Sequence, residues 1–278
     1  FNGDVTSDAI TPDVIKRLQH LARSHGATLF QLTLALWAVV LCRHAGQDEV
    51  AVGSPYHGRD AVGTETLIGY FVNVLALRVE VPRGGDVASI VRGASEVAAG
   101  GMRHAAVPFQ QIVHELLPKR VHDASHNAIF QAMLGWGEEA EGSTATDHGL
   151  SGSHADVQPV ATVGVVAKTE ISLDGGMTAR GHIDGTISFN LDLYVLASME
   201  RFASRLVVLA GALADAGPSA FASTLSVMQK DESEGVLWHF NDTSAAFPTN
   251  SSIYDLVMER ASRTPDAMVL EWQRGMMT

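Results

Sequence analysis

The chain has 278 residues, of which 46% are hydrophobic and 18% charged, a balance typical of folded globular proteins. The formal net charge of −12 argues against non-specific binding to a nucleic-acid backbone, which requires a positive patch. The apolar run Ala27–Cys42 is interrupted by Gln31 and Thr33, and no stretch reaches the roughly 18–20 apolar residues that span a bilayer.

The first third of the chain predicts two helices and one strand. Residues 1–10 are expected to be extended, and Thr11-Pro12-Asp13 is a good helix start because Thr can cap and Pro suits the first helical position. A second helix, about Leu29 to His44, is apolar almost all round and should be buried. The β-branched run Glu49–Ser54 predicts a strand, and Tyr56–Thr66 predicts a loop.

The middle of the chain alternates between strand and helix patterns. Phe71–Val81 predicts a strand, and Asp86 can cap a helix over Val87–Arg103. Pro108 is expected to open a short helix, and Ala128–Trp136 predicts a further strand. The Gly/Ser-rich acidic segment Glu138–Gln158 is interpreted as a mobile surface loop.

The next segment predicts further strands at Val160–Val166, Thr169–Leu173 and Ile183–Leu191, with a hairpin turn at Gly175-Gly176 and an amphipathic helix over Val195–Leu213. The mixture of strands and helices indicates an α/β or α+β class.

The pattern changes near residue 214. Ala214–Ser251 is expected to be a linker with one short helix, followed by a helix over Ile253–Ala261 and a strand over Ala267–Trp272. One helix and one strand cannot make a core, so we expect a truncated second domain. The predicted organisation is a domain over 1–228, a linker over 229–250 and a partial domain over 251–278.

Cys42 is the single cysteine, so no internal disulfide forms. Its apolar surroundings predict a buried, unreactive thiol. The lack of disulfides fits a reducing compartment, and we expect a cytoplasmic location. The chain begins at Phe1 without Met, as if cut from a longer polypeptide.

Local signatures of common enzymes are absent from the sequence: there is no P-loop, dinucleotide fingerprint, HExxH or GxSxG motif. The twelve histidines do not fall at metal-ligand spacings with cysteine partners, so no metal is expected.

Four segments along the chain form a recognisable set: Asp48-Glu49-Val50-Ala51-Val52-Gly53-Ser54-Pro55 with Gly58-Arg59, Ile68-Gly69-Tyr70-Phe71-Val72-Asn73-Val74 with Arg78, Val107-Pro108-Phe109-Gln110, and His122 to Gln131. In this order they resemble motifs of the condensation domains of nonribosomal peptide synthetases. The resemblance covers about residues 10–230, and departures such as Gln110 for the usual Glu and His122 and His126 for the usual Arg leave the fold prediction intact.

The resemblance implies a chloramphenicol-acetyltransferase-like lobe with a mixed sheet and packed helices. The family forms a peptide bond between two carrier-bound thioesters, using an HHxxxDG motif that no part of this sequence contains. The chain is therefore expected to be the C-terminal, acceptor-side lobe, inactive alone and binding no cofactor directly. Expected partners are the N-terminal lobe, the adenylation domain, and donor and acceptor carriers that bear phosphopantetheine.

The resemblance also suggests residues that face the substrate tunnel. The candidates are Asn73, Arg78, Tyr56, His57 and Ser54, with structural roles as the alternative for Asn73 and Arg78. Residues expected to be structural within the motifs are Gly69, Phe71, Pro108, Phe109 and Asn127.

A second resemblance, over Phe240–Thr243 and Arg263–Ala267, is to the condensation-to-adenylation linker and the opening of an adenylation domain, without that family's ATP-binding loops. One rival hypothesis is a non-catalytic module that docks carrier and adenylation domains. Another is a freestanding acyltransferase using His182 near Asp184-Gly185, at a spacing shorter than the family motif.

Overall fold

The structure of this chain is a computed structural model that describes residues 2–6, 10–64, 66–117, 127–138, 165–177, 183–217, 219–268, 270–272 and 275–277. The chain divides into two compact units, Phe1–Lys230 and Asp231–Thr278. The predicted segment Glu138–Gln158, apart from Glu138, lies outside the described residues, as do residues 160–164, His122, His126 and His182.

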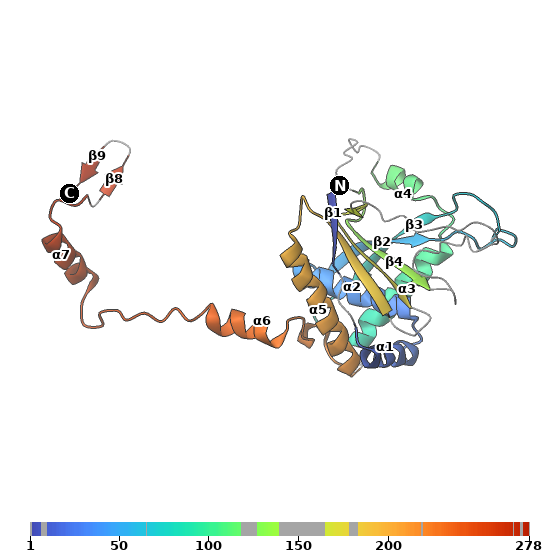
Figure 1. The fold of residues 1–278 in the computed structure, drawn as a ribbon, viewed down its shortest axis with the longest axis horizontal. Coiled ribbons are helices and arrows are strands. Elements are labelled where there is room, and N and C mark those ends of the chain that lie inside the picture. Colours follow the sequence, from blue (N-terminus) through green and yellow to red (C-terminus); the bar gives the residue numbers. More distant parts are fainter. Residues whose placement is uncertain are drawn as a thin grey trace, which may run out of the picture. The chain divides into compact units, whose positions relative to one another are not determined.

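The first unit is built on a seven-stranded mixed sheet with the order β3-β2-β4-β6-β7-β1-β5 (Figure 1). The β2–β4 and β4–β6 pairs are parallel, and the other strand pairs in the sheet are antiparallel. The strands are β1 (Asn2–Thr6), β2 (Glu49–Tyr56), β3 (Asn73–Glu80), β4 (Ala132–Glu138), β5 (Val165–Val166), β6 (Ile171–Met177) and β7 (Ile183–Asn190).

Helices pack on one face of this sheet. In the chain's contacts, α2 lies against β2, α3 against β3 and α5 against β1, while α1 packs on α2 and α5. The helices of the first unit are α1 (Pro12–Ser24), α2 (Leu29–Ala45), α3 (Val87–Arg103), α4 (Phe109–Leu116) and α5 (Leu196–Asp215), with a 3-10 turn η1 (Ala222–Thr224).

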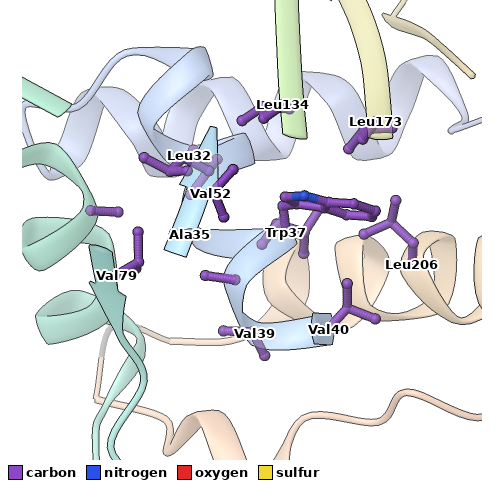
Figure 2. Close-up of a cluster of buried hydrophobic side chains, with 14 of the residues drawn as sticks. Leu32, Ala35, Trp37, Val39, Val40, Val52, Val79, Leu134, Leu173 and Leu206 are labelled. Atoms are coloured by element: carbon purple, nitrogen blue, oxygen red, sulfur yellow. The ribbon is translucent and has the colours of Figure 1, made fainter. Parts of the chain in front are cut away.

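The core lies between this face of the sheet and helix α2, which is the helix predicted to be buried. Thr28 and Gln31 form a capping box at its start, and Gly46 ends it in the left-handed conformation with φ of 66°. Trp37 is fully buried and meets Phe202 of α5 edge to face at 5.7 Å. Figure 2 shows Trp37 beside buried leucines from the strands and from α5.

Two predictions near the sheet are corrected. Gly175 and Gly176 do not form a hairpin turn, because both lie inside β6, paired in register with Gly185 and Asp184 of β7. A Cβ on Gly176 would lie 1.9 Å from the carbonyl oxygen of Gly137, so the close approach of β4 explains the glycine.

The N-terminal segment is extended over residues 2–6, as predicted, and the other correction concerns the start of one strand. Residues expected only to be extended form β1, which pairs with β7 on one side and β5 on the other. The strand predicted from Ala128 begins at Ala132, because residues 127–131 form a bend in which Asn127 bonds to Ile129 and Gln131.

The second unit has few elements. Helix α6 (Lys230–Glu234) continues without a break as one π-helical turn, η2 (Gly235–His239), so the two form one short helical segment within the predicted linker. Helix α7 (Ile253–Arg263) starts at a capping box between Ser252 and Asp255. A hairpin follows, β8 (Leu270–Trp272) and β9 (Gly275–Met277).

Over the described residues, no single helix has the length and hydropathy needed to cross a bilayer. Helices α1 and α2 satisfy that test only as a pair, across a bend of 104°, and α2 is buried in the core.

Candidate functional site

The candidate site is built around the loop that joins β2 to β3. Ser54, near the end of β2, is buried and donates to the Leu134 carbonyl oxygen at 2.9 Å, so its hydroxyl ties β2 to β4. Tyr56 ends the strand, and its hydroxyl donates to the Asp60 carboxylate, a bond that raises the pKa of Tyr56. His57 follows with its side chain exposed.

The loop doubles back on itself through two glycines and one arginine. Gly58 has φ of 64°, and a Cβ there would lie 2.1 Å from the Phe71 carbonyl oxygen. Gly69 sits against the Phe71 ring, where a Cβ would lie 3.0 Å from Cε2. The Arg59 guanidinium lies over the Phe71 ring, 4.4 Å from its centroid.

Asn73, the first residue of β3, fixes the turn between α3 and α4. Its Nδ2 donates to the carbonyl oxygens of Ala105 and Val107, both at 2.8 Å, and its Oδ1 accepts from the Phe109 N–H at 3.2 Å. Pro108 is the N-cap residue of α4 and offers no side-chain cap, so this amide satisfies one of the free N–H groups at the helix start.

The Phe109 side chain continues the same contact network across the sheet. Its ring packs on Phe130 with centroids 5.4 Å apart, and the Phe130 ring covers Gly53 of β2. Asn127 holds the segment that carries Phe130, since its Oδ1 accepts from the Ile129 N–H at 3.3 Å. The structure thus brings together four motif segments that are far apart in the sequence.

Arg78 lies apart from this network on the exposed surface of β3. It donates to the Glu49 carboxylate across the β2–β3 pair and lies 3.7 Å from Glu80, and the bond to Glu49 raises the pKa of Arg78. The pair borders an open groove of about 630 Å³ whose lining includes Gln131 and Tyr194. Both partners of Arg78 therefore come from this chain.

The described residues contain no group of three His, Cys, Asp or Glu side chains placed to hold a metal ion. Cys42 is buried, and burial, with the charges of Asp48 and Glu49, raises its pKa from 9.0 to about 11. A thiol with such a pKa is protonated at neutral pH and is a poor nucleophile.

The family model of the condensation domain matches residues 1–237. The chain belongs to the condensation domain family. Among curated proteins it is 30% identical over 272 residues to tyrocidine synthase 3 of Brevibacillus parabrevis, and 28% identical over 280 residues to surfactin synthase subunit 1 of Bacillus subtilis (strain 168). The chain covers 97% and 100% of its own length in these matches but only 4% and 8% of the two synthetases.

Solved structures of the family share the fold. A four-domain nonribosomal peptide synthetase bound to AMP and glycine superimposes with a TM-score of 0.75 at 21% identity, over 96% of this chain and 20% of that one. The first condensation domain of the CDA synthetase gives a TM-score of 0.62 at 18% identity, over 82% of this chain and 49% of that one. The predicted α/β class, with helices packed on a mixed chloramphenicol-acetyltransferase-like sheet, is confirmed.

The contacts of Arg59, of Phe130 and of the Ala105 and Val107 carbonyls are not predicted from the sequence, where Arg59 stands only as part of a motif. A signal for its stacking was present, since a glycine-preceded arginine and a phenylalanine flank one loop, but its other partners are backbone carbonyls that leave no pattern in the sequence.

Proposed function

We propose that this chain is the acceptor-side lobe of a condensation domain in an elongation module of a nonribosomal peptide synthetase. The observation that carries the proposal is that the chain spans 49% of the solved first condensation domain of the CDA synthetase while its sequence contains no HHxxxDG motif. A chain with the motifs of the β2–β3 loop and of α4 would form the side of the substrate tunnel that faces the catalytic histidines of the other lobe.

The proposed reaction joins two carrier-bound thioesters. The acceptor amine attacks the donor carbonyl, a C–N bond forms, and the tetrahedral intermediate collapses with cleavage of the C–S bond. The amine proton leaves and the carrier's phosphopantetheine thiolate takes one up to become a thiol. The second histidine of HHxxxDG, outside this sequence, would orient or deprotonate the amine, and this chain would restrict the amine's approach.

Within this proposal the site residues divide by their contacts. Tyr56 and His57 start the loop and are the candidates to line the tunnel. Asn73 acts by holding the α4 turn, because both of its N–H groups already have carbonyl acceptors. Ser54 is turned into the sheet, and Arg78 belongs to the sheet surface, where Glu49 and Glu80 neutralise it.

The proposed partners are the N-terminal lobe, the donor and acceptor carriers and the adenylation domain, in the cytoplasm. Residues 229–250 would link to that domain and 251–278 would begin it. The exposed apolar face of α7, with Ile253 and Val257, is what the first helix of an incomplete domain would present.

An alternative function is docking of carrier and adenylation domains without chemistry. It is favoured by the lack of an HHxxxDG motif in this sequence and by exposed apolar side chains in the β2–β3 loop and in α7. Amide formation separates the two functions, because only the first requires the chain during turnover.

The test is product formation from two loaded carriers. The chain is incubated alone, with the N-terminal half of a condensation domain that carries HHxxxDG, and with that half after its second His is replaced by Ala. Mass spectrometry of the acceptor carrier should detect dipeptide only with the intact pair of halves. Dipeptide from the chain alone, or equal dipeptide from the N-terminal half without the chain, would refute the proposal.

A further inference from the structure

The loop between β2 and β3, residues 57–72, is organised around the guanidinium group of Arg59. Arg59 donates through one nitrogen, Nη1, to the carbonyl oxygens of Thr64 and Leu67, the latter at 2.9 Å, while its face stacks on Phe71. A cation that binds two carbonyls and an aromatic ring at once joins the outgoing limb, the tip and the returning limb of the loop.

The backbone around Arg59 is shaped for these contacts. Gly58 allows the Phe71 carbonyl to approach the outgoing limb, and Thr64 closes a turn by donating from its N–H and hydroxyl to the Ala61 carbonyl at 3.0 and 2.6 Å. The Leu67 N–H then donates to the Thr64 carbonyl at 3.3 Å. Each of these bonds spans three residues, whereas the Arg59 contacts reach as far as Phe71 on the returning limb.

The loop presents apolar side chains that nothing in the described part of the chain covers. Ile68 is 103% exposed and Tyr70 89% exposed, with Val62 and Leu67 exposed beside them. An apolar tip at the end of a loop is expected to move freely unless a contact at its base restrains it. The Arg59 contacts supply such a restraint, because they join Thr64, Leu67 and Phe71.

We propose that Arg59 is a positioning residue that preforms this loop, so that Ile68 and Tyr70 meet the amino-terminal half of a condensation domain without a prior ordering step. The inference rests on the proposed function for the identity of the partner. The occupant follows from the fact that the chain spans only about half of the solved condensation domains, which leaves the other half as the surface available to cover this tip. A preformed loop binds more tightly, because the loop is already ordered and binding does not cost the conformational entropy of ordering it.

The first arm of the experiment measures loop order in this chain alone. Amide hydrogen exchange is followed at Thr64 and Leu67 in the wild type, Arg59→Ala, Arg59→Lys and the control Arg83→Ala. Arg83 is another exposed arginine, hydrogen-bonded to Asp48 at 3.0 Å outside the loop. Arg59→Ala should reduce protection of both amides about tenfold, Arg59→Lys should fall between, and the control should match the wild type. A common melting temperature for all four proteins shows that each variant is folded.

The second arm measures assembly with the amino-terminal half and turnover by the pair. If Arg59→Ala lowers the preformed fraction of the loop to about one tenth, the apparent Kd for that half should rise about tenfold. At saturating concentrations of the half, the rate of amide formation should return to the wild-type level, because the proposed role of the Arg59 guanidinium is to order the loop through Thr64, Leu67 and Phe71. If Arg59 merely stabilised the fold, Arg59→Ala would lower the melting temperature. It would not raise the Kd selectively while the saturated rate stayed at the wild-type level.

The two arms separate the two claims. Equal loop protection in the wild type and Arg59→Ala would overturn the role of Arg59 even if the wild type is active. Loss of protection without a change in Kd would overturn the link between loop order and the partner. If the wild-type chain fails to bind the amino-terminal half, the proposed function falls and the partner named here falls with it, while the exchange data still decide whether Arg59 orders the loop.

Discussion

The Phe130 ring occupies the place that a side chain on Gly53 would need. A Cβ on Gly53 would lie 2.3 Å from Phe130 Cε2, closer than any real contact. Because Phe130 also stacks on Phe109, the glycine in β2 decides how near α4 can lie to the sheet. Three motif segments meet at this contact, and Asn73 of the fourth accepts a hydrogen bond from the Phe109 N–H, so one added methyl group on Gly53 tests the arrangement.

Gly53→Ala should destabilise the chain by about 1–3 kcal/mol, the usual cost of overpacking a filled site. Gly185→Ala is the matched control in the same sheet, because a Cβ there meets only Leu173 Cδ1 at 3.7 Å. The control should be neutral or stabilise by up to about 1 kcal/mol, through a lower entropy of the unfolded chain. Urea denaturation measures both, and equal midpoints for the two variants would contradict the packing described here.

Asn73→Ala should remove three hydrogen bonds to the turn before α4 and cost about 1–3 kcal/mol, because the Ala105 and Val107 carbonyls and the Phe109 N–H lose their partner. Asn73→Asp should also destabilise, since a carboxylate cannot donate to those carbonyls. The control is Asn241→Ala, which removes contacts to the exposed Val236 and Leu237 carbonyls and should change the free energy of unfolding by less than about 0.5 kcal/mol. Loss of stability of the same size in all three variants would show that the turn is not special.

Cys42 predicts a loss of stability in alkaline solution. Its pKa is raised to about 11 in the folded chain from 9.0, so the folded chain keeps the proton while the unfolded chain releases it. The stabilising effect is therefore complete below pH 9.0 and is lost as the pH rises toward 11. Urea denaturation across this range should show the decline in the wild type and a weaker decline in Cys42→Ala.

The same residue predicts slow thiol chemistry. At neutral pH, native Cys42 should react with a disulfide reagent far more slowly than the urea-unfolded chain, because it is protonated and buried. Rapid stoichiometric reaction of the native chain would contradict its placement in the core.

The exposed apolar tip predicts association of the chain when it is alone. Ile68 and Tyr70 are free to contact a second copy or a hydrophobic dye. The double variant Ile68→Ser, Tyr70→Ser should lower dye fluorescence and sharpen the elution peak in size-exclusion chromatography, more than Leu237→Ser in the second unit. A sharp monomer with low dye binding in the wild type would argue against this surface as an interface.

Periodicity predicted the elements that carry a strong local pattern. Helix α2 was predicted from an apolar run with Thr28 at its start, and β2 and β3 were predicted from β-branched runs. These elements could be predicted because apolar residues favour burial and Thr favours the N-cap wherever they occur. The turn predicted at Gly175 and Gly176 was wrong, because the sequence does not distinguish a glycine required by a turn from one required by the close approach of a neighbouring strand. Only the register of β4 on β6 distinguishes them.

The site was predictable as a set of residues but not as an arrangement. Asn73 was named, yet its partners are the backbone of Ala105 and Val107, which any residue would supply. The role of Arg59 in ordering the loop could not be predicted either, because its hydrogen-bond acceptors are the backbone carbonyls of Thr64 and Leu67. Backbone partners are set by the tertiary path of the chain and leave no side-chain signature.

The most direct test of the proposed function is a titration of the HHxxxDG-bearing half of a condensation domain with this chain, with the rate of dipeptide formation on loaded carriers as the signal. Neither half alone should form product, and the rate should rise with added chain and saturate at one chain per half. Product formed without the chain, or no product at any ratio despite a bound 1:1 complex, would contradict its role as the acceptor-side lobe.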